Sequence, residues 1–257
     1  MSYLELKKVT KDFKGLRAVH EVDLSLKENE IMGLIGPNGA GKTTLFNLIT
    51  NLIPLSRGEI SWKDENITGL RTDLIAMKGI LRTFQIPRIF PRISIFENLL
   101  AGCHKHTSSG LFDAFSRSRE FYQEEKTIRD KTNNIIQFFK LETKKEVLAG
   151  SLPYGEMKKL AIAIIMNAEP ELMLIDEPAA GLNPYETIEL IDLIYKIRDR
   201  GIGILLVDHD MRFIMELCQK IYVLNYGKKI AEGKPDEIRR NDEVIKAYLG
   251  KRERENA

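Results

Sequence analysis

The segment from Gly36 to Thr44 gathers three glycines, a lysine and two threonines within nine positions. Residues 36–43 fit the spacing G-x-x-x-x-G-K-[ST], in which glycines let backbone N–H groups converge on phosphate oxygens. Lys42 can reach the β- and γ-phosphates of a nucleotide, and the Thr43 hydroxyl can bind Mg²⁺. We therefore expect a phosphate-binding loop, with a merely flexible loop as the alternative. The loop residues are Gly36, Pro37, Asn38, Gly39, Ala40, Gly41, Lys42, Thr43 and Thr44.

Two further segments place ionisable side chains directly after apolar runs. In "LMLIDEP", Asp176 can hold Mg²⁺ through the water shell of the ion, and Glu177 can orient and polarise an attacking water. An ordinary helix cap is the alternative for this acidic pair. His209 follows "ILLVD", and a lone histidine is usually structural. If its strand lies beside the other two, however, His209 can contact a γ-phosphate.

The elements around these segments predict an α/β protein. "EIMGLIG" is typical of a buried strand that feeds the loop, and "TTLFNLIT" of a helix with one apolar face. "ELMLIDEP" and "GIGILLVDHD" are apolar runs separated by a helical segment, which favours a parallel sheet. Before residue 31 and around "GEISWKDENI", apolar and polar residues alternate, so we expect an N-terminal antiparallel β-subdomain.

The remaining segments complete a single-domain prediction. Residues 1–86 and 161–235 form the nucleotide-binding core with its β-subdomain, 87–160 a helical subdomain, and 236–257 a C-terminal helix and tail. A long polar helix in the subdomain carries the apolar stripe Phe121, Ile128, Ile135 and Phe139. "KIYVLNYGKKIAEG" predicts a hairpin, "PDEIRRNDEVIKAYLG" one helix, and "KRERENA" a disordered tail.

Composition argues against several classes of protein. The 39 basic and 37 acidic side chains leave a net charge of +2, which argues against duplex DNA. The two cysteines provide neither a disulfide framework nor a zinc spacing. The start lacks the apolar stretch of a secretory signal, and the apolar runs are too short to span a bilayer. We expect a reduced, cytoplasmic, soluble protein.

In this order, "GPNGAGKTT", "LMLIDEPAAGLN" and "LLVDHD" resemble the nucleotide-binding subunits of ABC transporters, over nearly the whole chain. The resemblance implies ATP and Mg²⁺ as cofactors. It also implies that Phe13 stacks on adenine, that Gln85 contacts Mg²⁺ and water, and that His209 is the switch histidine. Residues 152–156, "LPYGE", match the signature segment, and residues 179–183 match a segment at the interface between subunits.

The signature segment departs from the usual family pattern L-S-G-G-Q. Pro153 replaces the serine, which removes a hydroxyl and a backbone donor near the opposing γ-phosphate. Tyr154 replaces the first glycine, Gly155 keeps the second, and Glu156 replaces the glutamine. Ile164 stands where an arginine is common. The family therefore gives least guidance on whether this segment contributes to ATP hydrolysis in this chain.

Within the family, "RTFQIPRIFPRISIFENLL" and "DEPAAGLNP" resemble the ATPase subunit of branched-chain amino acid importers. This resemblance implies a second ATPase subunit, identical or a sister chain, and transmembrane permease subunits as partners. It also implies a peripheral position on the cytoplasmic face of the membrane, with no nucleic acid and no direct contact with the solute. Three alternatives remain: the ATPase of lipopolysaccharide export, a soluble ABC protein acting on ribosomes or DNA, and a phosphate-loop kinase.

Overall fold

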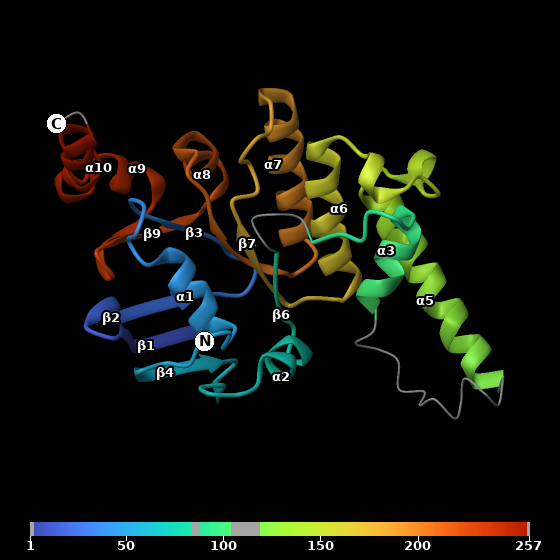
Figure 1. Cartoon of the computed structure of the whole chain (residues 1–257), viewed down its shortest axis with the longest axis horizontal. Helices are drawn as coiled ribbons and strands as arrows, with labels where there is room; N and C mark the ends of the chain where they lie inside the picture. Colours follow the sequence, from blue (N-terminus) through green and yellow to red (C-terminus); the bar gives the residue numbers. More distant parts are fainter. Residues whose placement is uncertain (1–2, 84–87, 104–118, 256–257) are drawn as a thin grey trace. The chain divides into compact units, whose positions relative to one another are not determined.

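The computed structural model of the 257-residue chain describes residues 3–83, 88–103 and 119–255 (Figure 1). Side-chain surroundings are described except at 119–121 and 249–255. Contacts divide the chain into two compact units. The first unit consists of residues 1–82, 171–180 and 187–257, and the second of residues 83–170 and 181–186.

The first unit contains a four-stranded antiparallel sheet with the order β2-β1-β4-β5. Its strands are β1 (Leu4–Phe13), β2 (Leu16–Leu26), β4 (Arg57–Trp62) and β5 (Glu65–Asn66). The alternating apolar residues of β2 and β4 are buried, among them Val22, Leu24, Ile60 and Trp62. Burial of one face of each strand explains why the alternation in the sequence predicts this sheet.

A second sheet has the order β10-β9-β3-β8-β7-β6. All of its pairings are parallel except that of the edge strand β10, which runs antiparallel to β9. Its central strands are buried along their whole length, as their continuous apolar sequences predict. The strands are β3 (Ile31–Ile35), β6 (Ile80–Arg82), β7 (Leu172–Asp176), β8 (Gly203–Val207), β9 (Lys220–Asn225) and β10 (Lys228–Gly233).

The predicted hairpin is formed by β9 and β10, with Tyr226 and Gly227 in the turn. Their φ angles are 45° and 77°, as a two-residue hairpin turn that follows the twist of its strands requires. One buried cluster joins side chains of the antiparallel sheet, of α1 (Lys42–Ile49) and of the parallel strands. The fold class predicted from the sequence is therefore confirmed.

The C-terminal region of the first unit differs from the prediction. In place of one helix it forms α9 (Pro235–Arg239) and α10 (Asp242–Glu255), and α10 continues through most of the tail expected to be disordered. The break lies at Asn241, whose side-chain oxygen accepts hydrogen bonds from the backbone N–H groups of Glu243 and Val244. Asparagine is a favoured helix N-cap, so a new helix begins there. The other helices of this unit are α2 (Thr72–Met77) and α8 (Met211–Leu217).

The second unit is helical in the described residues. It contains α3 (Ile95–Gly102), α5 (Arg119–Phe138) and α6 (Tyr154–Asn167), with short 3-10 turns at Glu142–Lys144 and Ala149–Ser151. α7 (Pro184–Arg198) begins in this unit and ends in the first. Of the predicted apolar stripe, Ile135 and Phe139 are buried, Ile128 is half-buried, and the side chain of Phe121 lies outside the described residues.

Candidate nucleotide-binding site

The glycine-rich loop connects β3, which ends at Ile35, to α1, which begins at Lys42. Gly36 has a φ of 149°, and a Cβ placed there would overlap the carbonyl oxygen of Leu224. Gly41 is the N-cap of α1 and has a left-handed conformation with a φ of 106°. The loop therefore depends on glycine at both ends, and it presents the electropositive N-terminus of α1 to a ligand.

Lys42 lies inside this loop. Its Nζ donates hydrogen bonds to the carbonyl oxygens of Gly36, at 2.6 Å, and Pro37, at 3.1 Å. The residue is only 6% exposed. A buried ammonium group is costly unless oxygen atoms surround it, and phosphate oxygens are stronger partners than these carbonyl groups.

The chemistry-bearing residues follow adjacent strands. β8 pairs with β3 on one side and with β7 on the other, so the carboxyl ends of all three lie side by side. Asp176 ends β7 and Glu177 follows it, while His209 comes two residues after the end of β8. Ligands of open α/β sheets bind at such carboxyl ends.

Glu177 and His209 contact each other directly, with 2.7 Å between Glu177 Oε1 and His209 Nε2. Glu177 has a φ of 48°, which is uncommon for a residue with a side chain, and its backbone N–H donates to the carbonyl oxygen of Val207 at 2.7 Å. The Glu177 side chain is 16% exposed and that of His209 is 49% exposed. A strained backbone that holds a carboxylate at a cavity is typical of functional sites.

Asp208, which sequence reasoning missed, links the loop after β8 to the loop after β7 by a hydrogen bond. It is 4% exposed, and its carboxylate accepts hydrogen bonds from the backbone N–H groups of Ala179, at 2.8 Å, and Asp210, at 2.9 Å. Its place between "LLV" and His209 is the only signal in the sequence, and it does not reveal the partner from the other loop.

Asp176 is paired with Arg82, a second residue that sequence reasoning missed. Arg82 Nη2 lies 2.7 Å from Asp176 Oδ2, and both side chains are nearly buried, at 8% and 9% exposed. The pairing depends on β6 lying next to β7 in the sheet. No spacing in the sequence indicates it.

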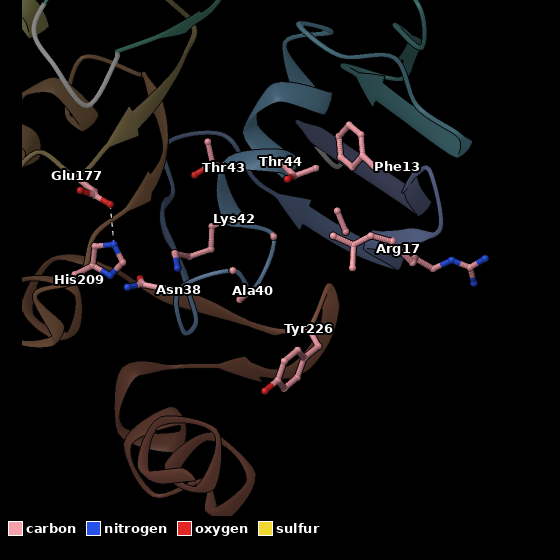
Figure 2. Close-up of a pocket in the computed structure, with 14 residues that line it drawn as sticks. Phe13, Arg17, Asn38, Ala40, Lys42, Thr43, Thr44, Glu177, His209 and Tyr226 are labelled. Atoms are coloured by element: carbon pink, nitrogen blue, oxygen red, sulfur yellow. Dashed lines mark ion pairs between the residues drawn. The ribbon is translucent and has the colours of Figure 1, made fainter. Parts of the chain in front are cut away.

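A pocket of about 520 Å³ opens over the loop. In Figure 2, Glu177 and His209 lie on one side of Lys42 and Phe13 lies on the other. Phe13 is 43% exposed, and Lys11 Nζ lies 4.9 Å from the centre of its ring. The pocket is lined by Phe13, Leu16, Arg17, Ala18, Asn38, Gly39, Ala40, Gly41, Lys42, Thr43, Thr44, Glu177, His209 and Tyr226.

Other predicted site residues do not line this pocket. Pro153 is the N-cap of α6, Tyr154 is 47% exposed at its first turn, and Glu156 pairs with Lys144. Together with Gly155 they belong to the second unit. Gln85 lies outside the described residues.

The oxygen donors of the first unit suit a hard cation such as Mg²⁺. Thr43 supplies a hydroxyl in the pocket, and Asp176, which does not line the pocket itself, supplies a carboxylate at the end of β7. No cluster of three or more His, Cys, Asp or Glu side chains that could hold a metal ion occurs among the residues that the structure describes. This combination fits an ion that arrives with phosphate groups and keeps part of its water shell.

Comparison with known proteins agrees with this geometry. The sequence profile of the ABC transporter family matches residues 19–180, which include the phosphate loop, Asp176 and Glu177. The chain belongs to the ABC transporter family. A profile described as branched-chain amino acid ATP-binding cassette transporter matches residues 228–254 of this ABC protein.

Two relatives and one solved structure illustrate the similarity. The chain is 42% identical to the high-affinity branched-chain amino acid transport ATP-binding protein LivG of Salmonella typhimurium, over 93% of this chain and 94% of LivG. It is 34% identical to the lipopolysaccharide export system ATP-binding protein LptB of Escherichia coli, over 97% and 98%. A nucleotide-free ATP-binding cassette from an ABC transporter has a TM-score of 0.85 and 27% identity, over 96% and 99%.

The family and the site together make this chain an ATP-binding ATPase subunit of the ABC type. Within the described ranges, no helix has the length and apolar character needed to cross a membrane.

Proposed function

We propose that this ABC protein hydrolyses ATP to drive the import of branched-chain amino acids. The proposed hydrolysis rests on one observation, the contact between Glu177 and His209 in the pocket over the phosphate loop. The solute class is supported by the C-terminal profile match and by the higher identity to LivG, 42%, than to LptB, 34%. Lipopolysaccharide export is the second candidate.

The phosphate loop binds the ATP phosphates through Lys42 and the backbone N–H groups of residues 36–44. Lys42 exchanges the carbonyl oxygens of Gly36 and Pro37 for β- and γ-phosphate oxygens. Phe13 stacks on the adenine at the opposite end of the pocket. Thr43, Asp176 and Gln85 would hold Mg²⁺, which neutralises charge on the phosphates when it is bound.

Glu177 orients the attacking water and polarises it, because its carboxylate accepts a hydrogen bond from that water. His209 keeps the Glu177 side chain in place through the 2.7 Å contact, and its ring is exposed enough to reach the γ-phosphate. Both residues act at the carboxyl edge of the parallel sheet, where the phosphate loop also begins.

We further propose that two ATPase subunits, identical or sister chains, face each other with ATP between them. Residues 153–156 of the opposite subunit then cover the γ-phosphate, with Gly155 letting its backbone approach. Transmembrane permease subunits bind the pair at the cytoplasmic face of the membrane, and the solute contacts those subunits rather than this chain. The exposed ring of Tyr154 at the start of α6 supports a role in covering a ligand of the other subunit.

Transport by the purified assembly tests this function. A tag on this chain recovers its membrane partners from native cells, and the complex is placed in liposomes with ATP inside and a solute-binding protein outside. We expect ATP-dependent uptake of labelled leucine, and none with Glu177→Gln in the same complex. Recovery of lipopolysaccharide-export partners, with no leucine uptake, would favour the second candidate.

A further inference from the structure

Arg82 occupies a position that the proposed mechanism does not use. It ends β6, and its guanidinium lies between two side chains of neighbouring elements. Nη2 lies 2.7 Å from Asp176 Oδ2, and Nη1 donates to Asn47 Oδ1 at 2.5 Å. The guanidinium carbon also lies 5.3 Å from the centre of the Phe46 ring.

Three side chains contact the guanidinium. Asn47 and Phe46 both come from α1, the helix that starts at the phosphate loop, and Asp176 comes from the end of β7. The register of the parallel pairing between β6 and β7, in which Arg82 lies opposite Leu174, brings the Arg82 side chain within reach of Asp176. A long side chain held by an ion pair, an amide and an aromatic ring has little rotamer freedom left, so the carboxylate it grips is also held in one orientation.

The ion pair places the fixed positive charge of Arg82 beside the Asp176 carboxylate, which is the proposed metal ligand. With 8% and 9% of the two side chains exposed, water and salt screen this charge poorly. A divalent cation that approaches Asp176 therefore meets a carboxylate whose charge is already partly balanced. Repulsion between the cation and the guanidinium must weaken metal binding compared with an unpaired aspartate.

We propose that Arg82 is a positioning residue that holds Asp176 by Oδ2 and lowers the affinity of the nucleotide site for divalent metal ions. This inference rests on the proposed role of Asp176 in metal binding. As a consequence, the metal ion remains bound at the site only while phosphate oxygens also coordinate it. After ADP leaves, Asp176 remains paired with Arg82.

Mn²⁺ binding, measured by electron paramagnetic resonance, tests the inference without relying on turnover. The purified full-length chain is saturated with ADP and titrated with Mn²⁺ as wild type, Arg82→Gln and Arg82→Lys. We expect Arg82→Gln to lower the Mn²⁺ dissociation constant by about tenfold, because a buried charge close to the ion is removed. Arg82→Lys keeps the charge and should stay within about twofold of wild type.

An unchanged or higher dissociation constant in Arg82→Gln would overturn the inference and leave Arg82 as a structural anchor of β6. That failure is distinct from failure of the proposed function, which would appear as wild-type chain with ADP taking up no Mn²⁺ at all. Absence of Mn²⁺ binding in the wild-type chain would contradict both the proposed function and this inference.

A measurement on the wild-type chain covers the case in which Arg82→Gln does not fold. Arginine side chains are labelled with ¹⁵N, and the Arg82 signal is assigned by its loss in Arg82→Lys. With ADP present, we expect added Mg²⁺ to shift the Arg82 guanidinium signal, because the metal and the guanidinium share one carboxylate. A signal that stays in place while Mg²⁺ binds would contradict the inference.

Discussion

The ammonium group of Lys42 is buried against two carbonyl oxygens of its own loop, which are weak partners for a full positive charge. We predict that Lys42→Ala weakens ATP binding by about 10- to 100-fold, since charge-assisted hydrogen bonds to phosphate are lost. Calorimetry of ATP binding to the purified chain measures this. Lys7→Ala, which removes an exposed lysine outside the pocket lining, is the control for a general disturbance. Unchanged affinity in Lys42→Ala would mean that the loop does not cradle phosphates.

Glu177 is the residue whose replacement should separate binding from chemistry. Glu177→Gln keeps the size of the side chain but removes its charge, so we expect ATP affinity near wild type and a hydrolysis rate lower by about 10²- to 10⁴-fold. His209→Ala should slow hydrolysis less, because the Glu177 carboxylate remains. The measurements are equilibrium ATP binding and phosphate release. Turnover of Glu177→Gln near the wild-type rate would reduce Glu177 to a structural role.

At this scale the sequence predicts residues that belong to a local pattern. Lys42 and Glu177 stand beside glycines or apolar runs whose spacing indicates their chemistry. Arg82 stands in no such pattern, and the apolar run before Asp208 does not reveal its role, since the partners of both residues come from other strands and loops. Finding them requires the order of the strands in the sheet, which the sequence alone does not provide. The roles of the predicted site residues remain predictions.

The junction between β3 and α1 depends on backbone conformations that glycine allows. Gly36 combines a φ of 149° with the close approach of the Leu224 carbonyl, whereas Gly39 has a φ of 79° and nothing within 4 Å of a Cβ placed there. We predict that Gly39→Ala costs about 1 kcal/mol of unfolding free energy from backbone strain alone. Gly36→Ala should cost at least about 3 kcal/mol, because a steric overlap with a buried strand is added. Urea unfolding compares the two, and equal losses would argue against the overlap.

The start of α6 gives the second prediction at this scale. Pro153 is its N-cap and its side chain makes no capping hydrogen bond, while Glu156 stands three residues later. Pro153→Ser supplies a capping hydroxyl worth about 1 kcal/mol but restores freedom to the unfolded chain, worth about 0.4–1 kcal/mol. We therefore expect a thermal midpoint close to wild type and an ATPase rate that rises or stays equal. Loss of both stability and activity would show that Pro153 fixes the entry to the helix.

The elements themselves follow closely from their apolar patterns, because burial on one or both faces determines the period of a strand. The C-terminal region differs from the prediction, because one predicted helix is divided at Asn241, and β6 is not predicted from the sequence. An asparagine followed by two acidic residues is itself a helix-start signal. It competes with the apolar periodicity that continues on either side of it, and the periodicity alone does not decide between one helix and two.

For the whole molecule, the proposed shared site makes hydrolysis depend on pairing. We predict a slow ATPase rate for the dilute chain, with the rate per chain rising as protein concentration increases through the pairing equilibrium. Steady-state phosphate release over a wide concentration series measures this, with sedimentation to locate the equilibrium. A rate per chain that stays flat while dimers form would exclude a site completed by a second subunit.

The strand order also bears on synthesis at the ribosome. The antiparallel sheet lies wholly within residues 4–66, so its strands can pair as soon as that stretch has left the exit tunnel. β3 ends at Ile35, but its two neighbours, β8 and β9, begin at Gly203 and Lys220. Both edges of β3 therefore stay without their partner strands through most of translation. Unpaired strand edges make a nascent chain prone to aggregation. A message truncated before codon 203 yields a product that lacks both neighbours of β3, and such a product is a target for chaperones and proteases rather than a smaller ATPase.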